Sequence, residues 1–290
     1  MKYIGDHPLA SRHKLKAYYS FFSWQLSQIF PHEVVYNFVD NTKLVLKKGL
    51  TGATGNVYTG LHEFNDMGFV LHVLRPEDTF ADIGANMGVY SILASGNAGA
   101  ETYAFEPVPL TFKWLQKNIK INNLSDKVQA FNIGLGSLQS RMFFTSDLDT
   151  VNHVLAEHEN LTIGDKIDVE INKFDEVIGP LKIPLAIKID VEGFETEVIN
   201  GMSDTLKSKS LKALIIELNG LGERYGFNEF EVHSKLLNHG FSPYLYDPFT
   251  RQLTQQSSFG LLNTIYVRDI EFVQSRLNTA PHFKVFSEWI

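Results

Sequence analysis

The sequence predicts an α/β protein with a doubly wound, mainly parallel sheet. From Thr79 onward, apolar segments of strand length alternate with segments of helical length. Several strand segments are continuously apolar, as in residues 213–216, which is typical of strands covered by helices on both faces. The 290 residues, 44% hydrophobic and 20% charged, suit one large domain with appended segments.

The first half of the predicted sheet is a βαβαβ unit. It comprises strands at 79–83, 102–105 and 128–133 and helices at 88–94 and 109–122. Pro109 stands in the first turn of its helix, where the missing N–H is tolerated. Two further strand segments, 141–145 and 167–174, flank a polar loop that holds His153.

The second half of the sheet repeats the alternation. It comprises strands at 185–189, 211–217, 241–246 and 263–267 and helices at 194–207 and 229–239. A turn-rich segment separates the last two strands, and no internal repeat or flexible linker interrupts the pattern.

Residues 17–30 form an aromatic-rich segment that predicts an amphipathic helix. Apolar residues at positions 18, 21, 22, 26 and 29 follow helical spacing. The favoured interpretation is a helix packed on the core; the alternatives are a lid over a pocket, a dimer surface or a membrane-surface helix. The membrane alternative is the least favoured, because the basic residues precede the helix instead of lining one face.

Charge and composition exclude several classes of protein. The 26 Lys and Arg against 33 Asp and Glu give a net charge of -7, so nucleic acid is not expected as the main partner. The absence of cysteine excludes disulfides, thiolate metal sites and a cysteine nucleophile. We expect a cytoplasmic protein with no transmembrane segment, because the chain lacks long apolar runs and its first residues do not resemble a signal peptide.

The strongest local signal is a glycine turn after the first predicted strand. Residues 80–90 read FADIGANMGVY, a strand leading into a turn and then a helix whose free N–H groups face a ligand. Asn86 suits the tightest part of the turn because Asn tolerates left-handed backbone angles. A dinucleotide fingerprint requires glycine where this chain has Asn86 and Val89, which argues against a nicotinamide cofactor. The glycines alone are also consistent with a purely structural turn.

A carboxylate, Glu106, follows the glycine turn at the spacing typical of a ribose-binding acid. Glu106 ends the strand at 102–105, about twenty residues beyond the glycines, where a carboxylate can accept both hydroxyls of a nucleoside ribose. The alternative roles of helix cap or surface acid are less favoured, because ligands of open α/β sheets bind at the carboxyl ends of strands. Glycine turn and acid together predict a nucleoside ligand.

Three segments resemble the FkbM family of S-adenosylmethionine-dependent methyltransferases. They are DIGANMG at 82–88, FEP at 105–107 and IKIDVEGFE at 187–195. The resemblance covers roughly 55–270 and implies a Rossmann-like, mostly parallel sheet of seven strands with a final antiparallel strand at 263–267. It also divides the chain into an N-terminal helical or extended segment (1–54), the methyltransferase domain (55–270) and a tail (271–290).

The resemblance implies a set of cofactor-binding residues. Those expected around the methionine part of S-adenosylmethionine are Glu63, Asp82, Gly84, Asn86 and Gly88, with Asp190 beside the cofactor, and those expected around its ribose and adenine are Glu106, Pro107 and Asn132. The chain departs from the family pattern at 172–175, and nothing in 1–50 matches it.

Methylation of a hydroxyl requires a base or a metal to take the proton. Asp190 and Glu192 are the leading catalytic candidates, since they follow a buried strand at alternate positions and hence on one side. His153 is a third candidate, although an isolated loop histidine is more often simply exposed. The structural alternative is that Glu192 caps the next helix and Lys188 pairs with an acid.

An all-oxygen divalent site is a further option at the same edge of the sheet. Asp190, Glu217 and Asn219 could supply oxygen ligands to Mg²⁺. A helix cap with hydrogen-bonded turn residues is the favoured explanation of Glu217 and Asn219, so no metal is assigned.

The expected function is O-methylation of a small molecule, sugar or glycan with S-adenosylmethionine as donor. Two alternatives stay open: a nicotinamide-dependent oxidoreductase on a similar sheet, and a non-catalytic protein that binds S-adenosylmethionine. The expected partner is a small-molecule or carbohydrate acceptor, and a homodimer is a further option.

Overall fold

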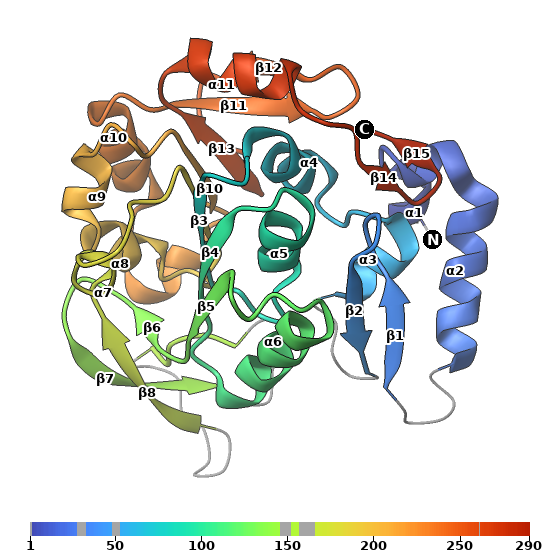
Figure 1. Ribbon diagram of the computed structural model, residues 1–290. Helices are drawn as coiled ribbons and strands as arrows, with labels where there is room; N and C mark the ends of the chain where they lie inside the picture. The colour runs from blue at the N-terminus through green and yellow to red at the C-terminus, as the bar shows by residue number, and fades with distance from the viewer. Residues whose placement is uncertain (1, 28–32, 48–52, 146–151, 157–165, 261) are drawn as a thin grey trace.

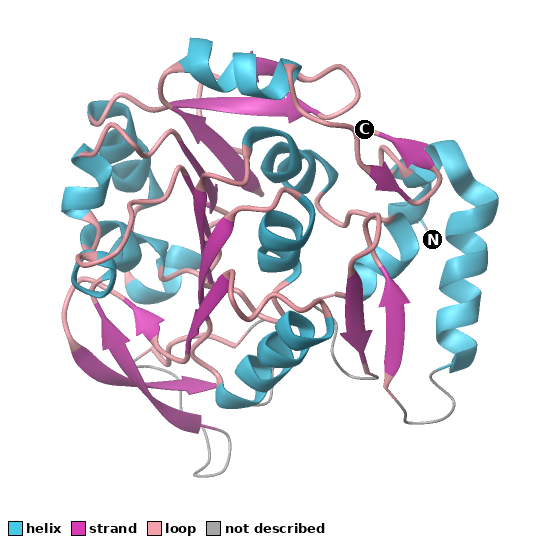
Figure 2. Ribbon diagram, viewed as in Figure 1, coloured by secondary structure: helices cyan, strands magenta, loops and turns pink. Residues whose placement is uncertain are grey.

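The computed structural model describes residues 2–27, 33–47, 53–145, 152–156, 166–260 and 262–290. Within these residues an eight-stranded sheet forms the centre of the molecule (Figures 1 and 2). Its strands are β3 (Thr79–Ile83), β4 (Glu101–Phe105), β5 (Val128–Phe131), β9 (Ala186–Ile189), β10 (Ala213–Glu217), β11 (Ser242–Asp247), β12 (Gln252–Gln255) and β13 (Asn263–Val267). They lie in the order β12-β11-β13-β10-β9-β3-β4-β5.

The strand directions confirm a mostly parallel, doubly wound sheet. Strands β5, β4, β3, β9 and β10 run parallel to one another, and β13 is inserted antiparallel between β10 and β11. The predicted count of seven strands is wrong by one, because β12 adds an antiparallel edge strand to β11. Strand β12 has the sequence QLTQ, and most of its residues are exposed. It therefore lacks the apolar pattern that predicts a strand.

Helices cover both faces of this sheet (Figure 2). One face carries α4 (Phe64–Val73), α5 (Val89–Ile92), α6 (Pro109–Ile121) and α11 (Ile270–Asn278), and the other carries α7 (Phe174–Ile178), α8 (Glu195–Asn200), α9 (Ser203–Lys207) and α10 (Glu229–Asn238). Successive side chains of each strand point to opposite faces of the sheet, so the strands contribute to two hydrophobic cores. Phe80 and Ile215 belong to the first core, and Ala81 and Leu214 belong to the second.

Two predicted elements differ from the structure. The strand expected at 167–174 is β8 (Lys166–Asn172), which joins β6 (Gly134–Leu135) and β7 (Ser140–Thr145) in a small sheet, and the fully buried Phe174 begins α7 instead. The helix expected at 194–207 forms as α8 and α9. Gly201 lies at the break, where an added Cβ would overlap the carbonyl oxygen of Gly136.

The N-terminal segment forms a layer beside the first core. It contains α1 (Lys2–Asp6), a 3₁₀ turn (Ala10–His13), α2 (Lys14–Ser27), β1 (Val34–Asn37), β2 (Lys43–Leu46) and α3 (Thr54–Thr59). Helix α2 buries Ala17 and Trp24 against the rest of the chain, so the predicted helix at 17–30 is confirmed as one that packs on the body of the protein. Its expected last residues, 28–30, lie outside the described part.

The two ends of the chain pack together (Figure 1). The C-terminal tail forms a hairpin of β14 (Lys284–Val285) and β15 (Glu288–Trp289). Its Glu288 forms an ion pair with Arg12 (2.8 Å) and a hydrogen bond with His13 (2.7 Å), and Lys16 donates to the carbonyl of Phe286. The division at 54 and 270 remains a prediction, but the first and last segments lie against each other.

No helix in the described residues combines the length and the apolar character required to cross a bilayer.

The turn after β3 depends on a glycine. Gly84 has a φ of 78°, and its Cα hydrogen faces the backbone at the end of β9, where an added Cβ would overlap the carbonyl oxygen of Asp190. A side chain here meets both a left-handed backbone and a rigid neighbour.

We predict that Gly84→Ala lowers the free energy of unfolding by about 3 kcal/mol or more, because left-handed strain adds to a backbone clash. Gly226→Ala is the matched control: its φ is 74°, but nothing lies within 4 Å of the added Cβ. That control should lose only about 1 kcal/mol. Urea unfolding of both variants measures the difference, and equal losses would contradict the close approach at Gly84.

Candidate active site

The turn from β3 to α5 places its backbone against the end of β4. The N–H groups of Gly84 and Ala85 donate to the carbonyl of Phe105 at 3.0 and 2.9 Å. Asn86 takes the left-handed conformation predicted for it, with a φ of 51°, and its N–H donates to Glu106 Oε2 at 2.9 Å. The glycine turn and the acid are therefore joined directly.

Glu106 is held in place at the carboxyl end of β4. It is 5% exposed, and its Oε1 accepts a hydrogen bond from the Val108 N–H at 2.8 Å. Burial raises the pKa of Glu106 to about 7, against the opposing effect of the two backbone N–H donors. Asn132 does not contact this carboxylate but donates to the carbonyls of Glu106 and Pro107, fixing the turn that carries the acid.

The side chain of Asp82 forms hydrogen bonds with the first turn of α5. Its Oδ2 accepts hydrogen bonds from the N–H (2.9 Å) and the hydroxyl (2.6 Å) of Ser91. Burial raises its pKa, against the nearby Lys188. Asp82 thus orients the helix that follows the glycine turn.

Lys188 is a buried cation in the middle of the site. It is 3% exposed, its Nζ lies 2.6 Å from Asp190 Oδ2, and it stacks 4.8 Å from the centre of the Tyr90 ring. Burial alone would lower the pKa of Lys188, but the Asp190 and Glu63 carboxylates raise it above its ordinary value. The predicted pairing of Lys188 with an acid is confirmed.

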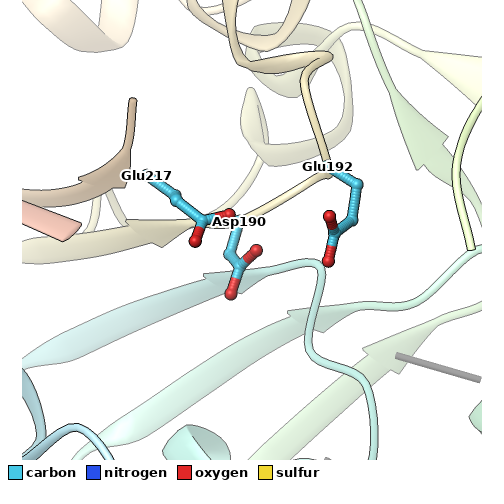
Figure 3. Close-up of side chains that lie close together, drawn as sticks. All are labelled: Asp190, Glu192 and Glu217. Carbon is cyan, nitrogen blue, oxygen red and sulfur yellow. The ribbon is translucent and has the colours of Figure 1, made fainter. Parts of the chain in front are cut away.

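Three carboxylates converge beyond β9 and β10. One oxygen from each of Asp190, Glu192 and Glu217 lies within 4.8 Å of the others (Figure 3). Burial, followed by the charge of Asp190, raises the pKa of Glu192 to about 7 and that of Glu217 to about 8. We call these three residues the carboxylate trio.

Glu192 does not cap the next helix, as the structural alternative required. Glu195, the first residue of α8, instead holds the turn before that helix: its Oε1 accepts from the N–H groups of Val191 (2.9 Å) and Gly193 (3.3 Å). Glu192 itself has a φ of 56°, a strained conformation for a residue other than glycine. No hydrogen bond within the described residues engages its carboxylate.

The trio supplies oxygen ligands of the kind that Mg²⁺ prefers. Asn219, the third residue proposed with Asp190 and Glu217, instead accepts a hydrogen bond from the N–H of Leu221 at 3.0 Å. This is the hydrogen-bonded turn expected as the structural explanation of Asn219.

Glu63 is oriented from two sides. It precedes α4, and its Oε2 accepts from the Tyr90 hydroxyl at 2.8 Å. Its Oε1 accepts from the side-chain amide of Asn263 at 2.6 Å. Both oxygens are therefore fixed at the edge of the sheet.

Two cavities meet at the glycine turn. The inner cavity, of about 50 Å³, lies between β4, α6 and the small sheet, and the outer cleft, of about 540 Å³, lies between α3, α4 and α5. Predicted residues that line the inner cavity are Gly84, Asn86, Glu106, Pro107, Asp190 and Glu192. Those that line the outer cleft are Glu63, Asp82, Gly84, Asn86, Asp190 and Glu192. Helix α2 contributes no residue to either, which does not support a lid.

Some predicted residues lie outside both cavities. An added Cβ at Gly88 would overlap Leu115, so this glycine lets α6 pack on the turn. His153 is buried and pairs through its backbone with Thr145, and the residues that line the inner cavity here are its neighbours Asn152 and Val154. Catalysis by His153 therefore has no geometric support and stays a prediction.

The sequence reasoning missed Tyr90, Tyr58 and His62 as parts of the outer cleft. Tyr90 lies two residues after Gly88, so its place in the glycine-turn motif could have identified it as a site residue. Tyr58 lies in α3, where no motif marks it.

Comparison with known proteins gives a family. Residues 82–243, more than half of the chain, match the model described as the methyltransferase FkbM domain. "Methyltransferase 1" of Beauveria bassiana is 30% identical over 151 residues, 44% of this chain and 60% of that protein. "Hexuronic acid methyltransferase AglP" of Haloferax volcanii is 29% identical over 152 residues, 52% of this chain and 59% of that protein.

A third relative is "31-O-demethyl-FK506 methyltransferase FkbM" of Streptomyces tacrolimicus, 24% identical over 212 residues, which cover 62% of this chain and 79% of that protein. The chain spans about six-tenths of the length of the first two relatives. The matched segment contains the glycine turn, Glu106 and the carboxylate trio. The chain therefore belongs to the FkbM methyltransferase domain family.

Proposed function

We propose that this protein is an S-adenosylmethionine-dependent methyltransferase that methylates a hydroxyl oxygen of a small molecule, sugar or glycan. The observation that carries the proposal is the buried Glu106, which lies beside the glycine turn and lines a cavity that continues toward a larger cleft. Family membership and the names of two relatives, a hexuronic acid methyltransferase and an O-demethyl-FK506 methyltransferase, support it.

The residues around the inner cavity have the chemistry of an adenosine site, but at about 50 Å³ the cavity must widen to hold the nucleoside, since ligand pockets typically measure about 300–1,000 Å³. Glu106 keeps acceptor capacity for ribose hydroxyls beyond its two backbone donors. Ile133, Leu135 and Phe144 give the cavity apolar walls suited to a base. Gly84 lines both cavities, and its missing side chain lets the glycine turn pack directly on the backbone of Asp190, which lines them too.

The outer cleft fits the amino-acid part of the cofactor. Glu63, fixed by Tyr90 and Asn263, offers a carboxylate for an ammonium group. Asp82 lines the same cleft but is occupied by Ser91, so we assign it the role of holding α5 rather than direct binding. The bound cofactor supplies an activated methyl group on a sulfonium.

Glu192 is the best-placed general base. It lines both cavities, so it lies where donor and acceptor must meet, and its pKa of about 7 suits proton transfer near neutral pH. Asp190 is held by Lys188 and lies beside Glu192 and Glu217. The acceptor hydroxyl would give its proton to Glu192 while the hydroxyl oxygen takes the methyl group from the sulfonium, which is left as a neutral thioether.

A divalent cation on the carboxylate trio is a variant of this mechanism, in which the trio binds metal and does not accept the proton. Chelation separates the two: activity that survives removal of divalent ions supports Glu192 as the base. Activity that is lost and then restored by Mg²⁺ supports the cation.

We predict that Glu106→Ala weakens binding of S-adenosylhomocysteine by about 1–3 kcal/mol, roughly 5- to 150-fold in Kd, because the ribose loses its charged acceptor. Isothermal titration measures the change. Glu101→Ala, an exposed acid at the start of the same strand, is the control and should bind like the wild type. An unchanged affinity in folded Glu106→Ala would remove this residue from the site.

For Glu192→Gln we expect kcat to fall by roughly 10²–10⁴-fold with cofactor affinity retained. A base acts in its ionised form, so the wild-type rate should decline as the pH falls below about 7, the pKa of Glu192, and level off above it. The pH–rate profile of both proteins tests this. Glu223→Gln changes an exposed acid in the 3₁₀ helix at Leu221–Tyr225 and serves as the control. Wild-type turnover in Glu192→Gln would refute Glu192 as the general base.

Replacing Lys188 by Met should destabilise the fold by about 2–4 kcal/mol at pH 8, since Asp190 and Glu63 lose their buried partner. The loss should be smaller at pH 5, where protonation removes the repulsion among the acids. Urea unfolding at the two pH values measures it. Lys212→Met, which breaks a more exposed pair with Asp269, should lose less than about 1 kcal/mol, and equal losses would contradict the role of Lys188.

A further inference from the structure

Helix α2 carries an exposed apolar stripe that the proposed function does not use. Its members are Leu15 (90% exposed), Tyr19 (74%), Phe22 (53%) and Leu26 (66%). They are spaced by four, three and four residues, the spacing of the seam in a two-stranded coiled coil. A row of four large apolar side chains in water is unusual for a monomer.

The stripe is not the face that packs on the rest of the chain. Ala17 and Trp24, seven residues apart, are the buried residues of α2. In a heptad with Leu15 and Phe22 at d and Tyr19 and Leu26 at a, they take the f position, on the side opposite the seam. The helix is therefore apolar on two sides, and only one of them is covered within the described residues. Figure 1 shows α2 at the outer edge of the molecule.

The charges of α2 fit a second copy of the same helix. From Ala17 to Ser27 the helix has no charged residue, so pairing two copies brings no like charges into the seam. The flanking exposed positions hold neutral polar groups such as Gln25. Lys14 and Lys16 stand at the first turn, and Lys16 is bound to the C-terminal hairpin.

These charges also select an orientation. In an antiparallel pair, Lys14 of each copy lies near the carboxyl end of the other helix, where the helix dipole favours a cation. A parallel pair would instead place both copies of Lys14 at the same end of the pair, away from either carboxyl end. The stripe is symmetric about its centre, so in the antiparallel pair Leu15 faces Leu26 of the other copy and Tyr19 faces Phe22.

We propose that two copies of this chain associate through the apolar stripe of α2 as an antiparallel helix pair. The seam from Leu15 to Leu26 is only about three turns long, so the dimer dissociates on dilution. This interface is independent of the methyl-transfer chemistry, because α2 lines neither cavity.

The absence of cysteine from the chain permits a direct test. Leu15→Cys and Leu26→Cys each introduce a single thiol, and the two sites lie roughly 16 Å apart along the helix. A disulfide needs Cα atoms about 4.4–6.8 Å apart. The antiparallel pair predicts a cross-linked dimer when the two variants are mixed and oxidised, and little when either is oxidised alone. Cross-linking of each variant with itself indicates a parallel pair and overturns the proposal, as does the absence of any cross-link.

Light scattering over a dilution series provides the second readout. The wild type should pass from dimer to monomer, whereas the double variant Tyr19→Lys, Leu26→Lys should be monomeric at every concentration with its circular dichroism unchanged. Leu110→Lys, on an exposed leucine of α6, is the control and should dimerise like the wild type. A wild type that is monomeric throughout, or that binds anionic lipid vesicles through Tyr19 and Leu26 as a monomer, contradicts the proposal.

Discussion

A single buried ammonium holds the carboxyl ends of the central strands together. Lys188 lies in the middle of the sheet, paired in register with Asp82 of β3 and Ile215 of β10. The carboxylates of Asp190, Glu63 and Asp82 all raise its pKa, which shows how closely they surround it. Several acids cannot be buried at one edge without a cation, because each unpaired charge would cost several kcal/mol. The acid-rich edge that forms the candidate active site therefore depends on this one lysine.

One ammonium does not balance all of these acids, and the imbalance shapes the chemistry. Glu192 and Glu217 are left with pKa values of about 7 and 8, so they exchange protons near neutral pH. Such groups are suited to take a proton from a hydroxyl. The remaining negative charge also favours a cationic ligand, and the sulfonium of the proposed cofactor is one. Fold, charge and proposed reaction thus follow from the same arrangement.

Elements with a strong apolar period could be predicted from the sequence, and elements held by tertiary contacts could not. Strand β3 forms at the residues expected, whereas β12 is polar and exists because β11 offers it an edge. The site follows the same rule. Glu106 and Asn86 belong to local motifs, so the sequence marks both as candidates, and the structure joins them by a hydrogen bond. The bond between Glu63 and Asn263 joins residues 200 positions apart, so nothing local could reveal it. Tertiary contacts also set the end of β8: Phe174, expected in that strand, begins α7 and buries its ring completely.

A crystal structure of the protein soaked with S-adenosylhomocysteine would show whether Glu106 and the two cavities bind the cofactor. We predict density that runs from the inner cavity to the outer cleft, with the ribose hydroxyls within hydrogen-bond distance of Glu106 and the sulfur near Asp190 and Glu192. Empty cavities at saturating ligand, or a nucleoside bound away from Glu106, would contradict the proposed function.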